Sequence, residues 1–182
     1  MMLRNKIQYQ HILSSTLLLC ILIAISKVEA HTCGENKIPF GLEVSRDGQP
    51  ALLCSKPDCF EKTYADCDER AFRRSCDKHS WLGGFDKSYG KHQPLYLQCC
   101  DFDNFDQVAE PLYHNVRVRP GEFFEGEEIQ DKASEETVAF DVITNMRLVR
   151  GPDRNVSYEI DVARLRCADI VRSKKYKNWS WP

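Results

Sequence analysis

"LYLQCCDFDNFD" (residues 95–106) contains two adjacent cysteines, Cys99 and Cys100, at the end of an apolar stretch. Successive side chains of a β-strand point to opposite faces of a sheet, so a strand here directs the two thiols to different sides. A disulfide between neighbouring residues would also require a distorted peptide bond. The stretch therefore predicts a strand whose two cysteines bond to two different partners.

The first 30 residues have the three-part layout of a secretory signal peptide. A basic start precedes an apolar run at residues 12–25, and Val28 and Ala30 occupy the −3 and −1 positions of a cleavage site. The apolar run is shorter than the roughly 20 residues that a membrane-spanning helix needs. We therefore interpret residues 1–30 as a cleaved signal peptide and expect a secreted, extracellular protein without a membrane span.

The number of cysteines is consistent with an extracellular protein. Cleavage removes Cys20 and leaves an even number of cysteines, as complete pairing requires. Seven of them lie between Cys33 and Cys100, a density typical of a disulfide scaffold. Because seven is odd, one of them is expected to pair with Cys167, although the connectivity as a whole stays open. The candidate disulfide residues are Cys33, Cys54, Cys59, Cys67, Cys76, Cys99, Cys100 and Cys167.

A redox or metal-binding role has less support from the sequence than a structural role of the cysteines in disulfides. A redox couple and a zinc ribbon both typically contain Cys-x-x-Cys, a spacing absent from this chain. Three aspartates of the quoted stretch, Asp101, Asp103 and Asp106, have the spacing of oxygen ligands for calcium, but the glycine and glutamate of an EF-hand loop are missing. A solvated acidic turn is favoured, and calcium binding stays open. We predict no catalytic, cofactor or metal site.

The first half of the chain contains one hairpin signal and one helix signal. An Asp-Gly turn at residues 46–50, between two apolar segments, predicts a hairpin with Cys33 and Cys54 at its base. The stretch "DCDERAFRRSCDKHSW" (residues 66–81) predicts a short helix. It has capping-box spacing near its start and places Phe72, Cys76 and His79 on one face at helical intervals.

The second half has the alternation of strands. Residues 113–120 predict a half-buried strand, and residues 137–150 and 156–167 predict a hairpin around a turn with glycine and proline. The apolar phase of the last strand slips at residues 163–164, which predicts a β-bulge. Between these strands, residues 121–136 are strongly acidic, which predicts an exposed loop in the middle of this segment.

The predicted fold class is α+β, with a small disulfide-rich domain of short strands and one helix, followed by a β-rich C-terminal segment. This interpretation divides the chain into a signal peptide (1–30), a cysteine-rich domain (31–106), a β-rich segment (107–171) and a basic and aromatic tail (172–182).

The cysteine-rich stretch carries a family resemblance. From Cys33 to about Asp103 it resembles the Wart domain of the Warthog proteins, which are hedgehog-related secreted proteins of nematodes. The motifs that carry the resemblance are "IPFG" (38–41), "GQP" (48–50), "PDCF" (57–60), "WLGG" (81–84) and the pair Cys99-Cys100.

The resemblance implies a secreted, non-catalytic protein that acts as an intercellular signal in development through an extracellular receptor. The alternative is a structural or adhesive component of an epidermal or cuticular extracellular matrix. A disulfide-rich protease inhibitor is a third class, but no reactive-loop signal is visible. Many Warthog proteins continue into a self-cleaving Hog domain that attaches a sterol. Only 15 residues follow Cys167, so we expect neither reaction here.

Three further features concern partners. Residues 31–182 carry 22 basic and 26 acidic side chains, a balance that argues against nucleic-acid binding. Asn155 and Asn178 lie in glycosylation sequons, and Asn155 falls in the predicted hairpin turn. The tail at residues 172–182 combines basic and aromatic side chains, which suits contact with a glycan or another polyanion. A solvated chain end is the competing interpretation of that tail.

Overall fold

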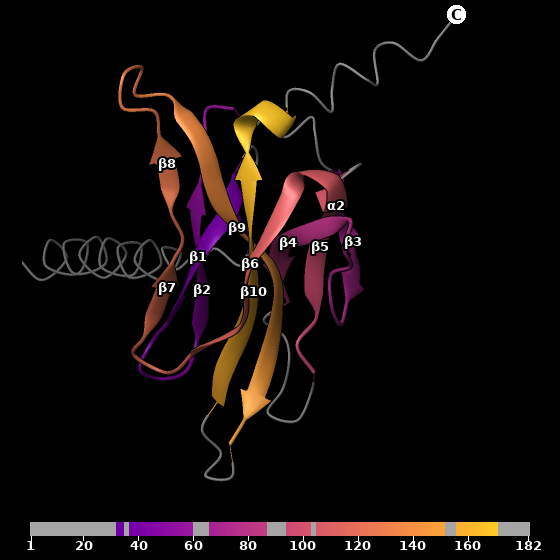
Figure 1. The fold of residues 1–182 in the computed structure, drawn as a ribbon. Helices are drawn as coiled ribbons and strands as arrows, with labels where there is room; N and C mark the ends of the chain where they lie inside the picture. The colour runs from indigo at the N-terminus through magenta and orange to yellow at the C-terminus, as the bar shows by residue number, and fades with distance from the viewer. Residues whose placement is uncertain are drawn as a thin grey trace, which may run out of the picture.

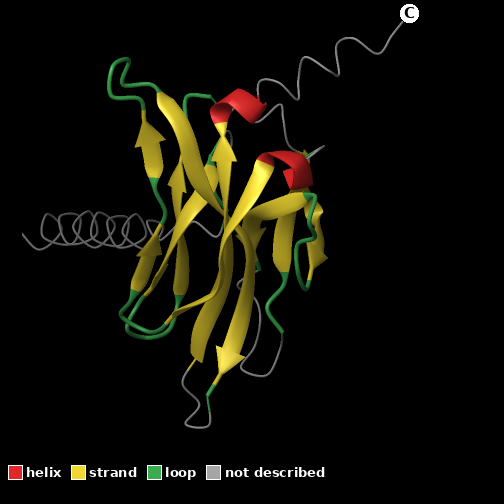
Figure 2. Ribbon diagram, in the orientation of Figure 1, coloured by secondary structure: helices red, strands yellow, loops and turns green. Residues whose placement is uncertain are grey.

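A computed structural model of the chain describes residues 32–34, 37–59, 66–86, 94–102, 105–151 and 156–170. Within these ranges the protein consists mainly of antiparallel strands in three sheets, with short helical turns (Figures 1 and 2). The α+β class predicted from the sequence is therefore met only roughly, because strands account for most of the described fold.

The first sheet contains the N-terminal hairpin, and its order is β2 (Pro50–Ser55), β1 (Ile38–Val44), β7 (Phe123–Glu125). The predicted hairpin is confirmed by the antiparallel register of β1 and β2. In its turn Gly48 has a φ of 86°, a left-handed conformation that glycine adopts without strain. The Gly48 carbonyl accepts a hydrogen bond of 3.1 Å from the buried Tyr158 hydroxyl, which ties the turn to the C-terminal half.

The second sheet has the order β6 (Ala109–Val118), β10 (Val156–Arg166), β9 (Thr137–Arg150), β8 (Glu128–Gln130). Its centre is the antiparallel pair of β9 and β10, the two strands predicted as a hairpin. The register shifts between Asp161 and Val162 against β9, and on both sides of Val162 against β6. The bulge therefore lies slightly before the predicted residues 163–164.

The third sheet corrects the predicted helix at residues 66–81. Its order is β3 (Asp66–Arg73), β5 (Leu97–Asp101), β4 (Ser80–Phe85). Cys67 lies directly opposite Cys100 across β3 and β5, and a disulfide joins the two residues. This cross-strand bond and the backbone ladder outweigh the weak helical preference of a short, charged segment.

Helix is limited to short elements in the described chain. The element α2 (Phe105–Val108) follows β5, and residues 167–170 form a further helical turn after β10. Phe105, Val108 and Ile170 are buried. These turns close one end of the molecule next to the sheets.

The acidic segment at residues 121–136, whose middle was predicted to be an exposed loop, includes two short strands. It contains β7, which pairs with β1, and β8, which pairs with β9. Edge pairing uses backbone groups, so acidic side chains that point to solvent do not prevent it. Between the two strands, the Gly126 N–H donates to the Phe40 carbonyl at 2.8 Å. The segment therefore links the first sheet to the second.

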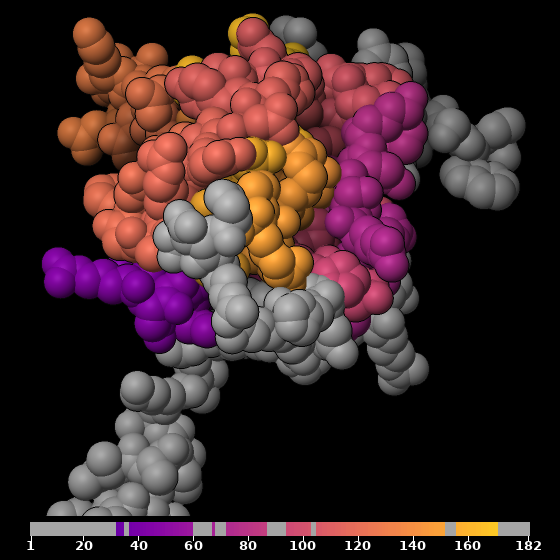
Figure 3. All heavy atoms as spheres, turned by 90° about the horizontal axis from the view of Figure 1, so that it is seen from below, coloured from indigo at the N-terminus to yellow at the C-terminus, as the bar shows by residue number. Residues whose placement is uncertain are grey.

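The long hairpin of β9 and β10 lies between the two smaller sheets, as the view from below illustrates (Figure 3). One buried cluster joins Ile143, Met146 and Ile160 to side chains of β1, β4 and β5. A second cluster joins Phe140 and Leu165 to Trp81, Phe105 and Ile170. Both clusters combine residues from before and after position 106. The fold is thus held by apolar contacts across the whole described chain.

Candidate functional site

Four disulfides connect the cysteines that the sequence singles out. Cys99 and Cys100 have separate partners, and Cys167 is bonded within the cysteine-rich half of the chain, both as the sequence predicts. The pairs are Cys33–Cys54, Cys59–Cys167, Cys67–Cys100 and Cys76–Cys99. Because a disulfide sulfur is neither a free nucleophile nor a thiolate ligand, these side chains serve as cross-links.

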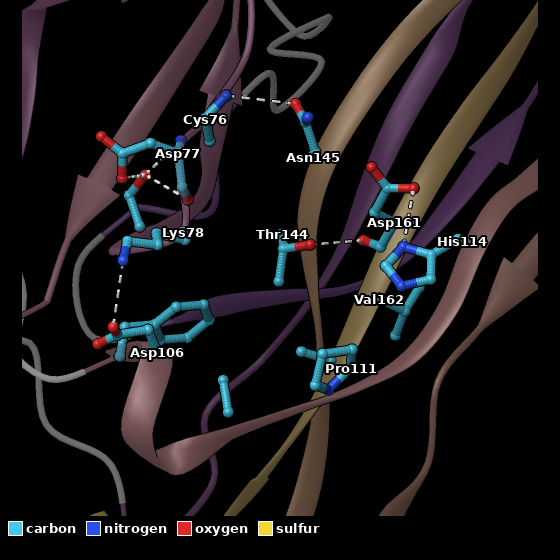
Figure 4. A pocket seen from close by; sticks show the side chains of 14 residues that line it. Cys76, Asp77, Lys78, Asp106, Pro111, His114, Thr144, Asn145, Asp161 and Val162 are labelled. Atoms are coloured by element: carbon cyan, nitrogen blue, oxygen red, sulfur yellow. Dashed lines mark hydrogen bonds and ion pairs between the residues drawn. The ribbon is translucent and has the colours of Figure 1, made fainter.

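A recess lies between the second and third sheets and is the most elaborate candidate site in the described structure (Figure 4). Its volume is about 310 Å³. One wall comes from residues 76–80, between β3 and β4, and a second from α2 and the start of β6. The third wall is the face of β9 and β10. The floor is mainly apolar, and the polar groups on its walls are Asp77, Lys78, Ser80, Asp106, His114, Thr144, Asn145 and Asp161.

The β-bulge of β10 places Asp161 in this recess. Bulges redirect side chains and locally interrupt pairing, and here Asp161 and Val162 flank the shift of register. The Asp161 carboxylate accepts hydrogen bonds from the Asn115 N–H at 3.0 Å and from Arg147 at 3.3 Å. The His114 Nδ1 lies 3.8 Å from the same carboxylate. Asp161 is thus held from two neighbouring strands.

Asn145 joins the two sheets that form the recess. Its Oδ1 accepts a hydrogen bond from the Cys76 N–H at 3.3 Å, across the gap between the third sheet and β9 (Figure 4). Cys76 is itself bonded to Cys99 of β5. The relative position of the two walls therefore depends on a disulfide and on a side-chain hydrogen bond.

The opposite rim of the recess carries paired charges. Asp106 lies 3.8 Å from the Lys78 ammonium and 3.4 Å from the His79 Nδ1. The Asp77 carboxylate accepts a hydrogen bond from the His79 N–H at 2.9 Å, and this bond is the main reason that the pKa of Asp77 lies below its ordinary value. The recess thus combines a mainly apolar floor with three carboxylates, Asp77, Asp106 and Asp161, each of which lies beside a basic side chain.

The aspartates of the acidic turn at residues 101–106 do not share one set of contacts. Asp101 is in an ion pair with Arg73 at 3.1 Å, while Asp106 contacts Lys78 and His79. Asp103 lies outside the described residues. Among the residues that the structure describes, no group of three or more His, Cys, Asp or Glu side chains has the arrangement of a metal site.

Several sequence predictions fall outside the described ranges. They are the signal peptide at residues 1–30, the sequons at Asn155 and Asn178, and the tail at 172–182. Within the ranges that are described, no helix has the length and apolar character to cross a bilayer.

Sequence reasoning did not identify the recess. Asp77, His114, Asn145 and Asp161 lie in four separate segments of the chain and share no motif. The one available signal was the slip of the apolar phase in the last strand, which pointed to a bulge close to Asp161.

Comparison with known proteins adds the family. A family model described as the Warthog N-terminal signalling domain matches residues 30–168. The chain belongs to the Warthog family. The match includes all four disulfides and every residue of the recess, and it extends well beyond the stretch to Asp103 that carried the resemblance in sequence.

Curated Warthog relatives from Caenorhabditis elegans agree with this assignment. Warthog protein 3 is 39% identical over 157 residues, which cover 84% of this chain and 86% of the relative. Warthog protein 5 is 36% identical, with the same shares of both chains. Warthog protein 1 is 28% identical over 79% of this chain, but the match covers only 37% of that longer relative. The comparison with solved structures gives no significant match.

Proposed function

We propose that this Warthog protein is a secreted, non-catalytic signal that acts between cells by binding an extracellular protein receptor. The disulfide set is the observation that carries the proposal. Four disulfides form and persist in oxidising compartments and are rare in cytosolic proteins. The description of the matching family model as a signalling domain supports the role itself.

The recess between the second and third sheets is the proposed receptor contact. Its apolar floor would bury the stem of a partner's arginine or the ring of an aromatic side chain, and these residue types are enriched in binding hot spots. The carboxylates of Asp77, Asp106 and Asp161 would face the cationic group. Asp161 is held by hydrogen bonds from two strands, which lowers the ordering cost of binding.

Glycosylation and the tail complete the proposal. Asn155, which lies between β9 and β10 in the sequence, would carry a glycan. The basic and aromatic tail at residues 172–182 would add contact with an anionic glycan or a matrix component.

A cell-surface binding assay with tagged mature protein tests the receptor contact. Pro111 is exposed at the mouth of the recess, so Pro111→Trp fills the recess without opening the core. Lys132→Trp places the same side chain on an exposed turn outside the recess and is the matched control. We expect Pro111→Trp to lose saturable binding while Lys132→Trp keeps it. Equal binding by both variants would remove the recess from the proposal.

Extraction of the protein from animal tissue tests whether it is a diffusible signal or a component of the extracellular matrix. A diffusible signal should be recovered from the medium or released by salt. A cuticular matrix component should stay insoluble until a reducing agent is added, and that result would favour the structural alternative.

A further inference from the structure

A second recess lies on the third sheet, apart from the one proposed for the receptor. Its volume is about 270 Å³, and it is lined by residues of all three strands together with Thr32, Gly34 and Lys37. The strand residues that line it are Cys67, Phe72, Gly83, Gln98 and Cys100. Thr32 forms a β-bridge with Gly84, which places the N-terminal part of this wall at the edge of the sheet.

Gly83 provides space on this face of the sheet. A Cβ atom at position 83 would overlap the Cys100 sulfur, so any larger residue would collide with the Cys67–Cys100 disulfide. Beside the disulfide, Phe72 is 44% exposed, an unusual degree for a phenylalanine. The recess thus has an apolar platform made by a disulfide and an aromatic ring.

Gln98 is the unusual group in this recess. The residue is only 5% exposed, yet its carboxamide has no hydrogen-bond partner among the described residues. A carboxamide offers two N–H donors and an oxygen acceptor, and buried polar groups in native proteins nearly always have partners. A buried amide that lines an accessible cavity is accounted for if a ligand supplies the missing hydrogen bonds.

The neighbouring side chains indicate the chemistry of that ligand. The Gln98 amide can both donate to and accept from hydroxyl groups, and Thr32 adds another hydroxyl to the wall. Lys37 is exposed and supplies a positive charge at the rim. A compact ring with several hydroxyls and one anionic group would use the amide, the apolar platform and the lysine together. We infer that this recess binds an anionic sugar residue, a uronate or a sulfated sugar, of an extracellular glycan.

Titration of the mature, full-length chain, selectively labelled with ¹⁵N-glutamine, tests this inference. The probes are a hyaluronan tetrasaccharide, a heparin tetrasaccharide and neutral chitotetraose. NMR would report the Gln98 side-chain amide, and calorimetry would report affinity. We expect at least one anionic probe to shift the Gln98 amide signals, with the neutral probe weaker. Absence of any shift at Gln98 with all three probes would overturn the inference.

Two variants separate ligand binding from folding. Gln98→Met conserves shape and removes the amide, so we expect affinity for the anionic probe to fall about tenfold. The midpoint of thermal unfolding should stay level or rise, because no internal hydrogen bond is lost. Lys37→Gln alters an exposed side chain and should reduce the preference for the anionic over the neutral probe. Gln130→Met, on β8 and exposed, is the matched control and should bind as the parent does.

Two results would contradict this assignment. A large fall in the unfolding midpoint of Gln98→Met would mean that the amide has an internal partner. Unchanged affinity in both Gln98→Met and Lys37→Gln would place any glycan contact elsewhere, for example on the tail.

Discussion

The ion pair between Asp141 of β9 and Arg164 of β10 gives the sharpest test of how the two central strands of the second sheet are held together. The Asp141 side chain is 1% exposed. Its oxygens accept hydrogen bonds from Arg164 Nε at 2.8 Å, from Arg164 Nη2 at 3.1 Å and from the Glu127 N–H at 2.9 Å. Asp141, with help from the Glu127 carboxylate at 2.8 Å, also holds the pKa of Arg164 above its ordinary value.

Replacement of Arg164 by methionine keeps the apolar stem and removes the charge. Asp141 would then be a buried carboxylate with a single remaining donor. Loss of one partner of a buried pair typically costs 3–5 kcal/mol, and because 21% of the Arg164 side chain is exposed we expect a loss of about 3 kcal/mol. Urea unfolding at pH 7, followed by the fluorescence of buried Trp81, would measure the change in free energy.

Arg166→Met is the matched control. Arg166 lies on the same strand and contacts Glu110 at 2.7 Å, but the two side chains are 61% and 59% exposed. An exposed pair contributes little, so this variant should lose less than about 1 kcal/mol. The double variant Asp141→Leu/Arg164→Met should recover much of the single-variant loss, because it leaves no buried charge. If Arg164→Met costs no more than Arg166→Met, the reasoning about burial is wrong.

Three other variants test separate parts of the fold. Gly126→Ala should lose about 1–3 kcal/mol of unfolding free energy by urea titration, because its Cβ would lie 2.7 Å from the Asp141 Cβ and 2.8 Å from the Phe40 carbonyl oxygen; full stability would mean that the link between the first two sheets is loose. The pKa of Asp77 is lower in the folded protein than its ordinary value of 3.8, so the charged carboxylate stabilises the fold at pH values above 3.8. This contribution is lost as the pH falls through the lower pKa of the folded protein. Asp77→Ala should therefore be less stable than the parent at pH 7, with the gap closing toward pH 2, and a gap that is constant with pH would show that the carboxylate charge is irrelevant. Removal of Cys59–Cys167, with a sequence separation of 108, should cost roughly 1.5 kcal/mol more than removal of Cys33–Cys54, with a separation of 21; the reverse order in calorimetry of the two Cys→Ser double variants would contradict the loop-entropy argument.

The features that local sequence rules predict well are those decided by a few neighbouring residues. Alternation of side chains on a strand is enough to place Cys99 and Cys100 on opposite faces. The Asp-Gly turn and the conformational freedom of Gly48 are enough for the first hairpin. In both cases the information lies within about ten residues, and the structure agrees with it.

Features that depend on distant residues were missed. β3 has the spacing of a helix start and few β-formers, and it becomes a strand because Cys67 is bonded to Cys100 on β5. β7 and β8 lie in an acidic segment whose backbone pairs with the edges of two sheets. Neither pairing partner can be found from the segment itself.

The candidate site shows the same limit. The sequence indicated a bulge in the last strand, but not that the bulge would carry Asp161 toward Asp77 and Asp106. Gln98 has no sequence signal at all, since an amide on a strand is ordinary until its burial and its lack of a partner among the described residues are known.

Peptide mapping of the native protein without reduction, after alkylation of any free thiol, tests most directly whether disulfides cross-link all the cysteines of the mature chain. We expect four cross-linked peptide pairs, Cys33–Cys54, Cys59–Cys167, Cys67–Cys100 and Cys76–Cys99, with no alkylated cysteine in the mature chain. A bond between Cys99 and Cys100, or alkylation of either residue in the native protein, would contradict it.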